Sequence, residues 1–276
     1  MLRLVSIATR SSGWTRLLRP LSSSAGPSRI VNCAIIAHVD HGKTTLMDRL
    51  LQFCGAELAG ERAMDSNEQE RERGITITSK YTRLRHRDSV LHFVDTPGHA
   101  DFGGEVERVL SMVDGVVLLV DATEGPMSQT KFVLSKAIAL GKPAVVVLNK
   151  VDRDTHRAEV VETEIFDLFC ALTSKDELLD YPLLFASARQ GWVTESLEEV
   201  PGKDVGPLLD AIVRRFPQAT SPEKLQLPFA LSVNTISTDN HLGRIVTGKV
   251  ETGKVSSLTS TWCPHRPRYP SGNPSR

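Results

Sequence analysis

The stretch from residue 37 to residue 44 constrains the fold of this chain more than any other feature. It reads Ala-His-Val-Asp-His-Gly-Lys-Thr, follows the apolar run Val31–Ile36 and leads into the amphipathic segment Thr45–Leu51. A strand, a tight turn with Gly-Lys-Thr and a helix in this order form a phosphate-binding loop. Backbone N–H groups at the helix N-terminus then surround a polyphosphate, Lys43 reaches its β- and γ-oxygens, and Thr44 holds Mg²⁺.

Short β-branched runs alternate with segments of helical periodicity between residues 29 and 216. The expected strands are Ile30–Ile36, Val90–Val94, Val116–Val120, Ala144–Leu148 and Leu183–Ala186, and the expected helices are Thr44–Phe53, Glu105–Met112, Gln129–Leu140, Glu159–Leu172 and Val205–Phe216. Runs that are apolar nearly throughout are typical of parallel strands covered on both faces. A hairpin is predicted for Thr76–Arg85 and Val90–Val94, which a charged turn separates. The hairpin adds one antiparallel strand at the edge of the sheet. The sequence therefore predicts an α/β fold with a doubly wound, mainly parallel sheet.

The chain changes character after this α/β region. Residues 217–228 hold three prolines among polar residues and are predicted to be a linker. Residues 229–259 alternate like β structure, which predicts the start of a β-barrel. Residues 260–276 hold four prolines without alternation, and we expect an unstructured or aberrant tail there. A half-built barrel exposes strand edges and an apolar face, so we expect residues 228–276 to be poorly stable or aggregation-prone.

The beginning of the chain has a different composition again. The first 39 residues contain five arginines, many serines and no acidic residue. Such a leader is typical of an organelle transit peptide, which we expect over residues 1–28, and the alternative is a disordered tail. Frequent arginine and a basic amphipathic pattern favour a mitochondrial location. Chloroplast and cytoplasm are the alternative locations.

Composition adds limits on partners. The 276 residues carry zero formal net charge, so overall electrostatics indicate neither nucleic acid nor membrane as a partner. Four cysteines lie far apart without a C-x-x-C pair, which is typical of reduced thiols and not of a disulfide frame or zinc site. No apolar stretch reaches the roughly 18 residues of a membrane span. We expect a monomer that binds neither membrane nor DNA.

A second motif, Asp95-Thr96-Pro97-Gly98-His99, follows the expected strand Val90–Val94. Ligands bind at the carboxyl ends of strands in open α/β sheets. The Asp95 carboxylate can hold a water of the Mg²⁺ shell there, and the Gly98 N–H can contact a γ-phosphate. Between the two motifs, Glu68–Arg73 is typical of a solvated face. Thr76 lies in a loop that can add its hydroxyl to Mg²⁺ only when the γ-phosphate is present, as a nucleotide switch requires.

The third motif, Asn149-Lys150-Val151-Asp152, closes the expected strand Ala144–Leu148. Asp152 can accept two hydrogen bonds from guanine N1–H and the exocyclic amine, and adenine offers no such donor pair. Asn149 can bond the base N7 and neighbouring loops, while the Lys150 stem can lie over the base plane.

A fourth, shorter element is Ser187-Ala188, which follows the expected strand Leu183–Ala186 and can offer a backbone N–H to guanine O6. Four elements in this order, each at the end of an expected strand, predict a GTP site and not a general phosphate site. The fold class is therefore that of a P-loop GTPase, with a GTP-binding (G) domain over residues 29–216.

Together these segments resemble the translational GTPases, the ribosome-acting elongation and initiation factors. The segments are Ala37–Thr45, Arg73–Ile77, Asp95–Asp101 and Asn149–Asp152. Within that group the stretch Asp95–Leu140, with Met64–Asn67, is most similar to the BipA/TypA family. The resemblance covers about residues 29–255. The first glycine of the loop is ordinarily alanine in this family, as it is at Ala37.

The resemblance implies a GTP-hydrolysing factor that acts on ribosomes, organellar ones if the leader is a transit peptide. It implies that His99 orients the attacking water and that Asp40 lies near the β/γ bridge, with K⁺ as a candidate monovalent cation. Lys43 and the Gly42 and Gly98 amides would stabilise charge on the transferring phosphoryl group. His38 and His41 are expected to shape the loop or face solvent, without a catalytic role.

The predicted site has three overlapping sets of residues. The nucleotide-binding set is Ala37, His38, Val39, Asp40, His41, Gly42, Lys43, Thr44, Thr45, Gly98, Asn149, Lys150, Asp152, Ser187 and Ala188. The catalytic set is His99, Lys43 and Asp40. The Mg²⁺ set is Thr44, Thr76 and Asp95.

One departure from the family pattern leaves two functions open. Family members continue through further domains, whereas the last residues here, from about Ser260, resemble nothing in the family. A truncated gene model, a read-through intron or a short isoform would each give such an ending. The chain is then either a ribosome-stimulated GTPase or a fragment that binds GTP without hydrolysing it.

Overall fold

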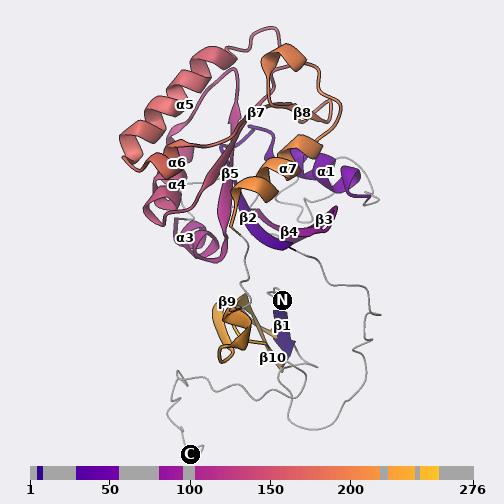
Figure 1. Ribbon diagram of the computed structural model, residues 1–276, viewed down its shortest axis with the longest axis vertical. Helices are drawn as coiled ribbons and strands as arrows, with labels where there is room; N and C mark the ends of the chain where they lie inside the picture. The colour runs from indigo at the N-terminus through magenta and orange to yellow at the C-terminus, as the bar shows by residue number, and fades with distance from the viewer. Residues whose placement is uncertain are drawn as a thin grey trace, which may run out of the picture. The chain divides into compact units, whose positions relative to one another are not determined.

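The computed structural model describes residues 5–8, 29–55, 81–95, 103–217, 223–239 and 243–254. The chain divides into two compact units, one of residues 10–220 and one of residues 1–9 with 221–276. Each unit has its own β-sheet (Figure 1).

The larger unit is built on a seven-stranded sheet with the strand order β3-β4-β2-β5-β6-β7-β8. Its strands are β2 (Arg29–Ala37), β3 (Tyr81–His86), β4 (Ser89–Asp95), β5 (Gly115–Asp121), β6 (Ala144–Asn149), β7 (Leu183–Ser187) and β8 (Trp192–Thr194). The five central strands pair in parallel, while β3 and β8 are antiparallel edges. The predicted mainly parallel sheet and its β3–β4 hairpin are confirmed. Residues 76–80, where the hairpin was expected to begin, lie outside the described residues.

Helices cover both faces of this sheet. They are α1 (Lys43–Phe53), α3 (Gly103–Met112), α4 (Ser128–Ala139), α5 (Ala158–Leu172), α6 (Asp176–Leu179) and α7 (Gly206–Arg215). Helices α1 and α7 pack on one face, and α3, α4 and α5 pack on the other (Figure 1). The five predicted helices are all present, with ends that differ by one or two residues.

Two hydrophobic clusters explain why the strand sequences are apolar without alternation. In β5, Val117 and Leu119 belong to the cluster under α1 and α7, whereas Val116 and Leu118 belong to the cluster under α3, α4 and α5. All four side chains are 0% exposed. Successive side chains of a strand point to opposite faces, so a sheet covered twice needs apolar residues at every position.

Three short elements of the larger unit were not predicted from the sequence. Helix α6 has four residues and β8 has three, and a 3₁₀ turn at Leu197–Glu199 follows β8. Such lengths are too short to show helical or strand periodicity, and only the neighbouring strand β7 specifies the pairing of β8.

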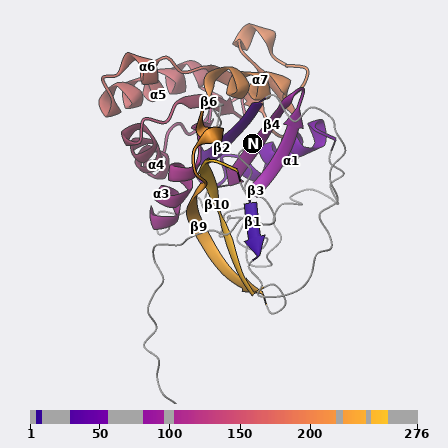
Figure 2. The same ribbon diagram turned by 60° about the horizontal axis from the view of Figure 1, so that its bottom comes forward.

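The smaller unit contains a three-stranded antiparallel sheet in the order β1-β10-β9. Its strands are β1 (Val5–Ala8), β9 (Ala230–Asp239) and β10 (Gly243–Thr252). Figure 2 shows β9 and β10 as a long hairpin, which confirms the β structure predicted after the linker. A 3₁₀ turn at Lys224–Gln226 lies within the predicted linker. Strand β1, which was not predicted, lies within the segment expected to be a transit peptide.

Two further findings concern membrane-spanning helices and cysteines. Among the residues that the structure describes, no helix is both long enough and apolar enough to cross a membrane. Cys33, Cys54 and Cys170, the cysteines within the described ranges, carry free thiols.

Candidate functional site

The predicted phosphate loop is a tight turn between β2 and α1. The His41 N–H donates to the His38 carbonyl at 3.3 Å and closes the turn. Asp40 and Gly42 have left-handed backbone φ angles of 64° and 94°. Left-handed residues alternating with ordinary ones bring successive backbone N–H groups together as an anion site. Helix α1 begins at Lys43, and its N-cap is Gly42, which has no side chain to occupy the first N–H donors.

The first helical turn carries the side chains expected to contact phosphate and Mg²⁺. Lys43 is 8% exposed, Thr44 is half-buried and Thr45 is exposed. A threonine hydroxyl is the hard oxygen ligand that Mg²⁺ prefers, so Thr44 fits its predicted role. Asp95 is the last residue of β4 and pairs in register with Ile35 of β2. This pairing places Asp95 at the carboxyl ends of the parallel strands, where the phosphate loop also begins.

Three predicted residues of the phosphate end lie outside the described residues. They are Thr76, Gly98 and His99. Their assigned roles in Mg²⁺ binding, γ-phosphate contact and water activation stay predictions.

Asn149, the last residue of β6, connects the phosphate loop to the loop after β7. Its Nδ2 donates to the His41 carbonyl at 2.8 Å, and its Oδ1 accepts the Ala188 N–H at 2.9 Å. Asn149 is 2% exposed. A Cβ added to Gly42 would collide with the Asn149 amide, and Gly42 already has a left-handed φ. Glycine is therefore required at this position for two separate reasons.

The residues predicted to read the base gather around one small cavity of about 140 Å³. Its lining residues are Gly42, Thr45, Asn149, Lys150, Asp152, Arg153, Ala188 and Arg189. Asp152 is half-buried there, so its carboxylate keeps access to a ligand. The structure thus brings the first, third and fourth motifs to a single place.

The Ser187-Ala188 pair supports this cavity from behind. Ser187 is 0% exposed, and its hydroxyl accepts the Gln190 N–H at 3.2 Å. The Ala188 N–H is bound to Asn149. A contact between this pair and guanine O6 therefore stays a prediction.

Arg49 of α1 also holds the loop after β7, and its role was not predicted. Its guanidinium donates to the Ala188 carbonyl at 3.3 Å and to the Arg189 carbonyl at 2.7 Å. In the sequence Arg49 is simply one polar residue of an amphipathic helix. Its target lies about 140 residues further along the chain, so no local signal identifies it.

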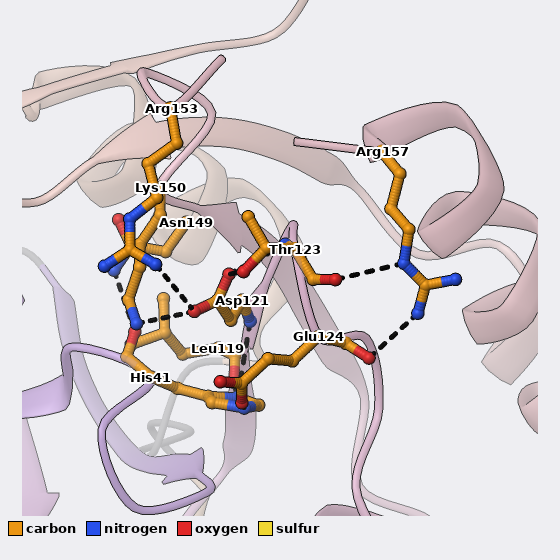
Figure 3. Close-up of polar contacts among 9 residues, drawn as sticks. All are labelled: His41, Leu119, Asp121, Thr123, Glu124, Asn149, Lys150, Arg153 and Arg157. Carbon is orange, nitrogen blue, oxygen red and sulfur yellow. Dashed lines mark hydrogen bonds and ion pairs between the residues drawn. The ribbon is translucent and has the colours of Figure 1, made fainter. Parts of the chain in front are cut away.

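A buried polar network that the sequence analysis missed joins the loop to the base motif (Figure 3). Asp121, at the end of β5, is 0% exposed and forms an ion pair with Lys150. The Asp121 N–H donates to His41 Nδ1 at 3.3 Å. Beyond it, Arg157 donates to the Thr123 and Glu124 carbonyls and pairs with Glu164 at 2.9 Å.

His41 is a loop-shaping residue, as predicted, and it is buried and not solvent-facing. Its ring is 0% exposed, with Nε2 at 3.4 Å from Glu124 and Nδ1 at 3.4 Å from the Leu119 carbonyl. Burial lowers the pKa of His41 from its ordinary value, because the interior disfavours the charged ring. A neutral ring can accept the Asp121 N–H at Nδ1.

Sequence comparison identifies the family. The elongation factor Tu GTP-binding domain model matches residues 28–218. The large ribosomal subunit assembly factor BipA of Synechocystis sp. is 50% identical over 233 residues, which are 83% of this chain and 38% of that protein. BipA of Escherichia coli K12 is 49% identical, with 82% and 38% covered. The chain spans less than half the length of these curated relatives.

Structure comparison gives the same fold. The bacterial selenocysteine-specific elongation factor EF-Sec matches with a TM-score of 0.63 at 24% identity, covering 82% of this chain and 35% of that one. Elongation factor SelB of Methanococcus maripaludis, solved with the GTP analogue GppNHp, matches with a TM-score of 0.62 at 21% identity, covering 83% and 43%. The chain therefore belongs to the family of the elongation factor Tu GTP-binding domain, the translational GTPases, and is similar to BipA within it.

Proposed function

We propose that this chain binds GTP and GDP with Mg²⁺ and hydrolyses GTP to GDP and phosphate, as a BipA-type factor on the ribosome. The observation that carries the proposal is the position of Asn149. Its amide bonds the phosphate loop and the loop after β7 at once, and it lines the small cavity. One side chain thus fixes the phosphate end and the base end of a nucleotide site relative to each other.

Binding follows from the residues around the loop. The backbone N–H groups of the turn and of the first turn of α1 take the β-phosphate, and Lys43 neutralises the β/γ oxygens. Thr44 and Asp95 supply hard oxygen ligands for Mg²⁺, which would neutralise charge on the phosphates when bound. Asp152 accepts the two guanine donors inside the cavity, and the Lys150 stem lies against the base plane.

Hydrolysis is an in-line displacement. Water attacks the γ-phosphorus, the bond to the β/γ bridging oxygen breaks, and GDP and inorganic phosphate leave. His99 orients that water, while Lys43 and the loop amides stabilise charge on the transferring group. Low intrinsic hydrolysis is expected, because switches of this class depend on a partner to place the catalytic residue. The proposed partner is the ribosome.

A nucleotide-binding assay tests the base-reading part. Calorimetric titration should show GTP and GDP binding and much weaker ATP binding. Asp152→Asn should shift preference toward xanthine nucleotides, because the variant amide offers a donor where the carboxylate accepted one. Unchanged guanine preference in Asp152→Asn would remove the base-reading role of Asp152.

A ribosome-stimulated GTPase assay tests turnover. Mitochondrial ribosomes should accelerate phosphate release, and His99→Ala should abolish the acceleration while GTP affinity stays near normal. An equal loss of GTP binding and GTP hydrolysis in His99→Ala would contradict the catalytic role of His99.

GTP binding without turnover is the second candidate function. The observation that favours it is that the matched region covers only 38% of the length of these BipA proteins. The match therefore supports the GTP-binding part and carries no information on the remaining parts of those proteins. GTP binding with no ribosomal stimulation would support this candidate.

The proposed location is the mitochondrion, supported by the acid-free, arginine-rich composition of the first residues. Residues 1–28 fused to a fluorescent protein should direct it to mitochondria, and diffuse fluorescence would contradict the proposal. K⁺ beside Asp40 is proposed on the family resemblance. Replacing K⁺ by Na⁺ in the GTPase assay should then lower the rate.

A further inference from the structure

Asp121 is a buried carboxylate to which the proposed nucleotide site gives no role. It is the last residue of β5 and pairs in register with Asn149, the first residue of the base motif. Its side chain is 0% exposed. A buried carboxylate is costly unless it is paired and hydrogen-bonded, so its partners indicate its purpose.

The two carboxylate oxygens have different partners (Figure 3). Oδ1 accepts the Thr123 N–H at 2.7 Å and the Thr123 hydroxyl at 2.6 Å. Oδ2 lies 2.5 Å from Lys150 Nζ and 3.9 Å from Arg153 Nη1. Burial raises the pKa of Asp121, but hydrogen bonds from Lys150 and Thr123 lower it by more, and the net pKa is below the ordinary value. Asp121 is therefore a charged acceptor in a fixed orientation.

Lys150 is held in an unusual way on the other side of this contact. Its backbone φ is 66°, in the left-handed region that non-glycine residues rarely adopt. The residue lines the small cavity, while its ammonium is bound by Asp121. Since the ammonium is fixed at one end and the backbone at the other, the aliphatic stem has a defined course beside the cavity.

A purely structural role for Asp121 would be to cap the turn at residues 121–123. The two Thr123 hydrogen bonds satisfy that role, and they use only Oδ1. The second oxygen is left for Lys150, a residue of the base motif. A charge-assisted bond of this kind is among the stronger contacts in a protein, and losing one partner leaves the other charge buried.

We propose that Asp121 is a positioning residue for guanine recognition, which binds the Lys150 ammonium and thereby holds the lysine stem against the base cavity. The inference rests on the proposed function, in which this cavity takes the guanine base. Asp121 contacts neither base nor phosphate and acts through Lys150.

A double-mutant cycle on the full chain tests this coupling by calorimetric titration with GDP. The variants are Asp121→Asn, which keeps the shape and loses the charge, Lys150→Met, which keeps a long stem and loses the ammonium, and their combination. Asp121→Asn should weaken GDP binding about tenfold, as the loss of a charge-assisted bond implies. In the Lys150→Met background the same substitution should have little further effect.

Asp210→Asn is the matched control. Asp210 of α7 also contacts two side chains, His86 at 2.8 Å and Arg87 at 2.9 Å, and none of the three lines the base cavity. The GDP affinity of the Asp210→Asn variant should equal that of the wild type. A loss equal to that of Asp121→Asn would show a general effect of removing a carboxylate and would overturn the inference.

Base selectivity separates positioning from disruption of the loop. Inosine diphosphate lacks the exocyclic amine that Asp152 reads, so the ratio of GDP to inosine diphosphate affinity reports on Asp152. Asp121→Asn should weaken both ligands equally and keep this ratio. A ratio that falls toward one would show that the whole base loop has moved, and it would overturn a role through Lys150.

A milder variant keeps the test valid if Asp121→Asn unfolds. Thr123→Val removes the hydroxyl that orients the carboxylate and should weaken GDP binding with Lys150 present but not in Lys150→Met. Additive losses of GDP affinity in either cycle would overturn this inference and leave the proposed function intact. Absence of GDP binding by the wild type would overturn the proposed function, and the inference with it.

Discussion

The two units of the chain differ in how much of their apolar surface is covered. In the larger unit, two hydrophobic clusters lie on the two faces of the seven-stranded sheet. In the smaller unit, Val233 and Ile236 of β9 are 49% and 65% exposed. Among the described residues of that unit, Val250 alone is a buried hydrophobic residue, at 3% exposure.

This difference indicates where stability and function reside. A sheet becomes stable when an apolar face is covered by another layer, and the larger unit has both faces covered by its own helices. Every described residue of the candidate site also belongs to the larger unit. We therefore expect folding stability and nucleotide binding to depend on the larger unit, and four experiments test that expectation.

The largest effect is expected from a matched pair of core substitutions. Leu118→Ala, at a fully buried position of β5, should lower the free energy of unfolding by about 3 kcal/mol because it leaves a cavity. Ile236→Ala on β9 should change it by less than about 0.5 kcal/mol, as exposed positions usually do. Urea unfolding followed by circular dichroism measures both. Equal losses would show that the smaller unit has a covered core after all.

The next effect concerns the bridge across the site. Asn149→Ala leaves the His41 carbonyl and the Ala188 N–H without their side-chain partner. GDP affinity should fall by about a hundredfold, since two buried polar groups lose their bonds at about 1–3 kcal/mol each. Gln226→Ala in the smaller unit is the control and should bind GDP as the wild type does. A loss of less than about threefold in Asn149→Ala would show that the two loops keep their positions without it.

The third effect is a pH dependence that arises from His41 in the larger unit. Burial lowers the pKa of His41, and the Leu119 carbonyl and the Asp121 and Glu124 carboxylates, which raise it, do not reverse that direction. Below the ordinary histidine pKa of about 6.5 the unfolded chain binds a proton that the folded chain does not. The contribution of His41 is therefore fully present above this pH and is lost as pH falls toward the lowered folded value.

Comparison with His41→Asn isolates this titration. The stability difference between wild type and variant should be constant above about pH 7 and should shrink as the pH falls through the mildly acidic range. Thermal unfolding at a series of pH values measures it. A difference that grows on acidification would mean that His41 is charged in the folded protein.

The smallest effect is expected from removing the smaller unit. A chain ending at residue 220 should bind GDP within about twofold of the full chain, because separate units make few contacts that a ligand site depends on. Limited proteolysis gives an independent reading, since cutting should begin within residues 228–276. A chain that loses those residues and also its GDP affinity would contradict the division.

Much of the larger unit could be predicted from residue patterns. Its central strands are apolar at every position because both faces are buried, and its long helices show clear periodicity, so both were predicted to within a few residues. The phosphate loop and Asn149–Asp152 were found because their functions depend on backbone conformation and on residue types at fixed spacing. Helix α6 and β8 were missed because four and three residues carry no period.

The phosphate loop, the base motif and the α/β order of elements can be identified from the chain alone, because each depends on local spacing of residues. Three features depend on contacts that form when the chain folds: Asp121 pairs with Lys150, Arg49 holds the loop after β7, and His41 is buried. Those contacts join residues separated by about 29 to 140 positions. Parallel pairing brings the ends of β5 and β6 together, and no local pattern records which side chains then meet.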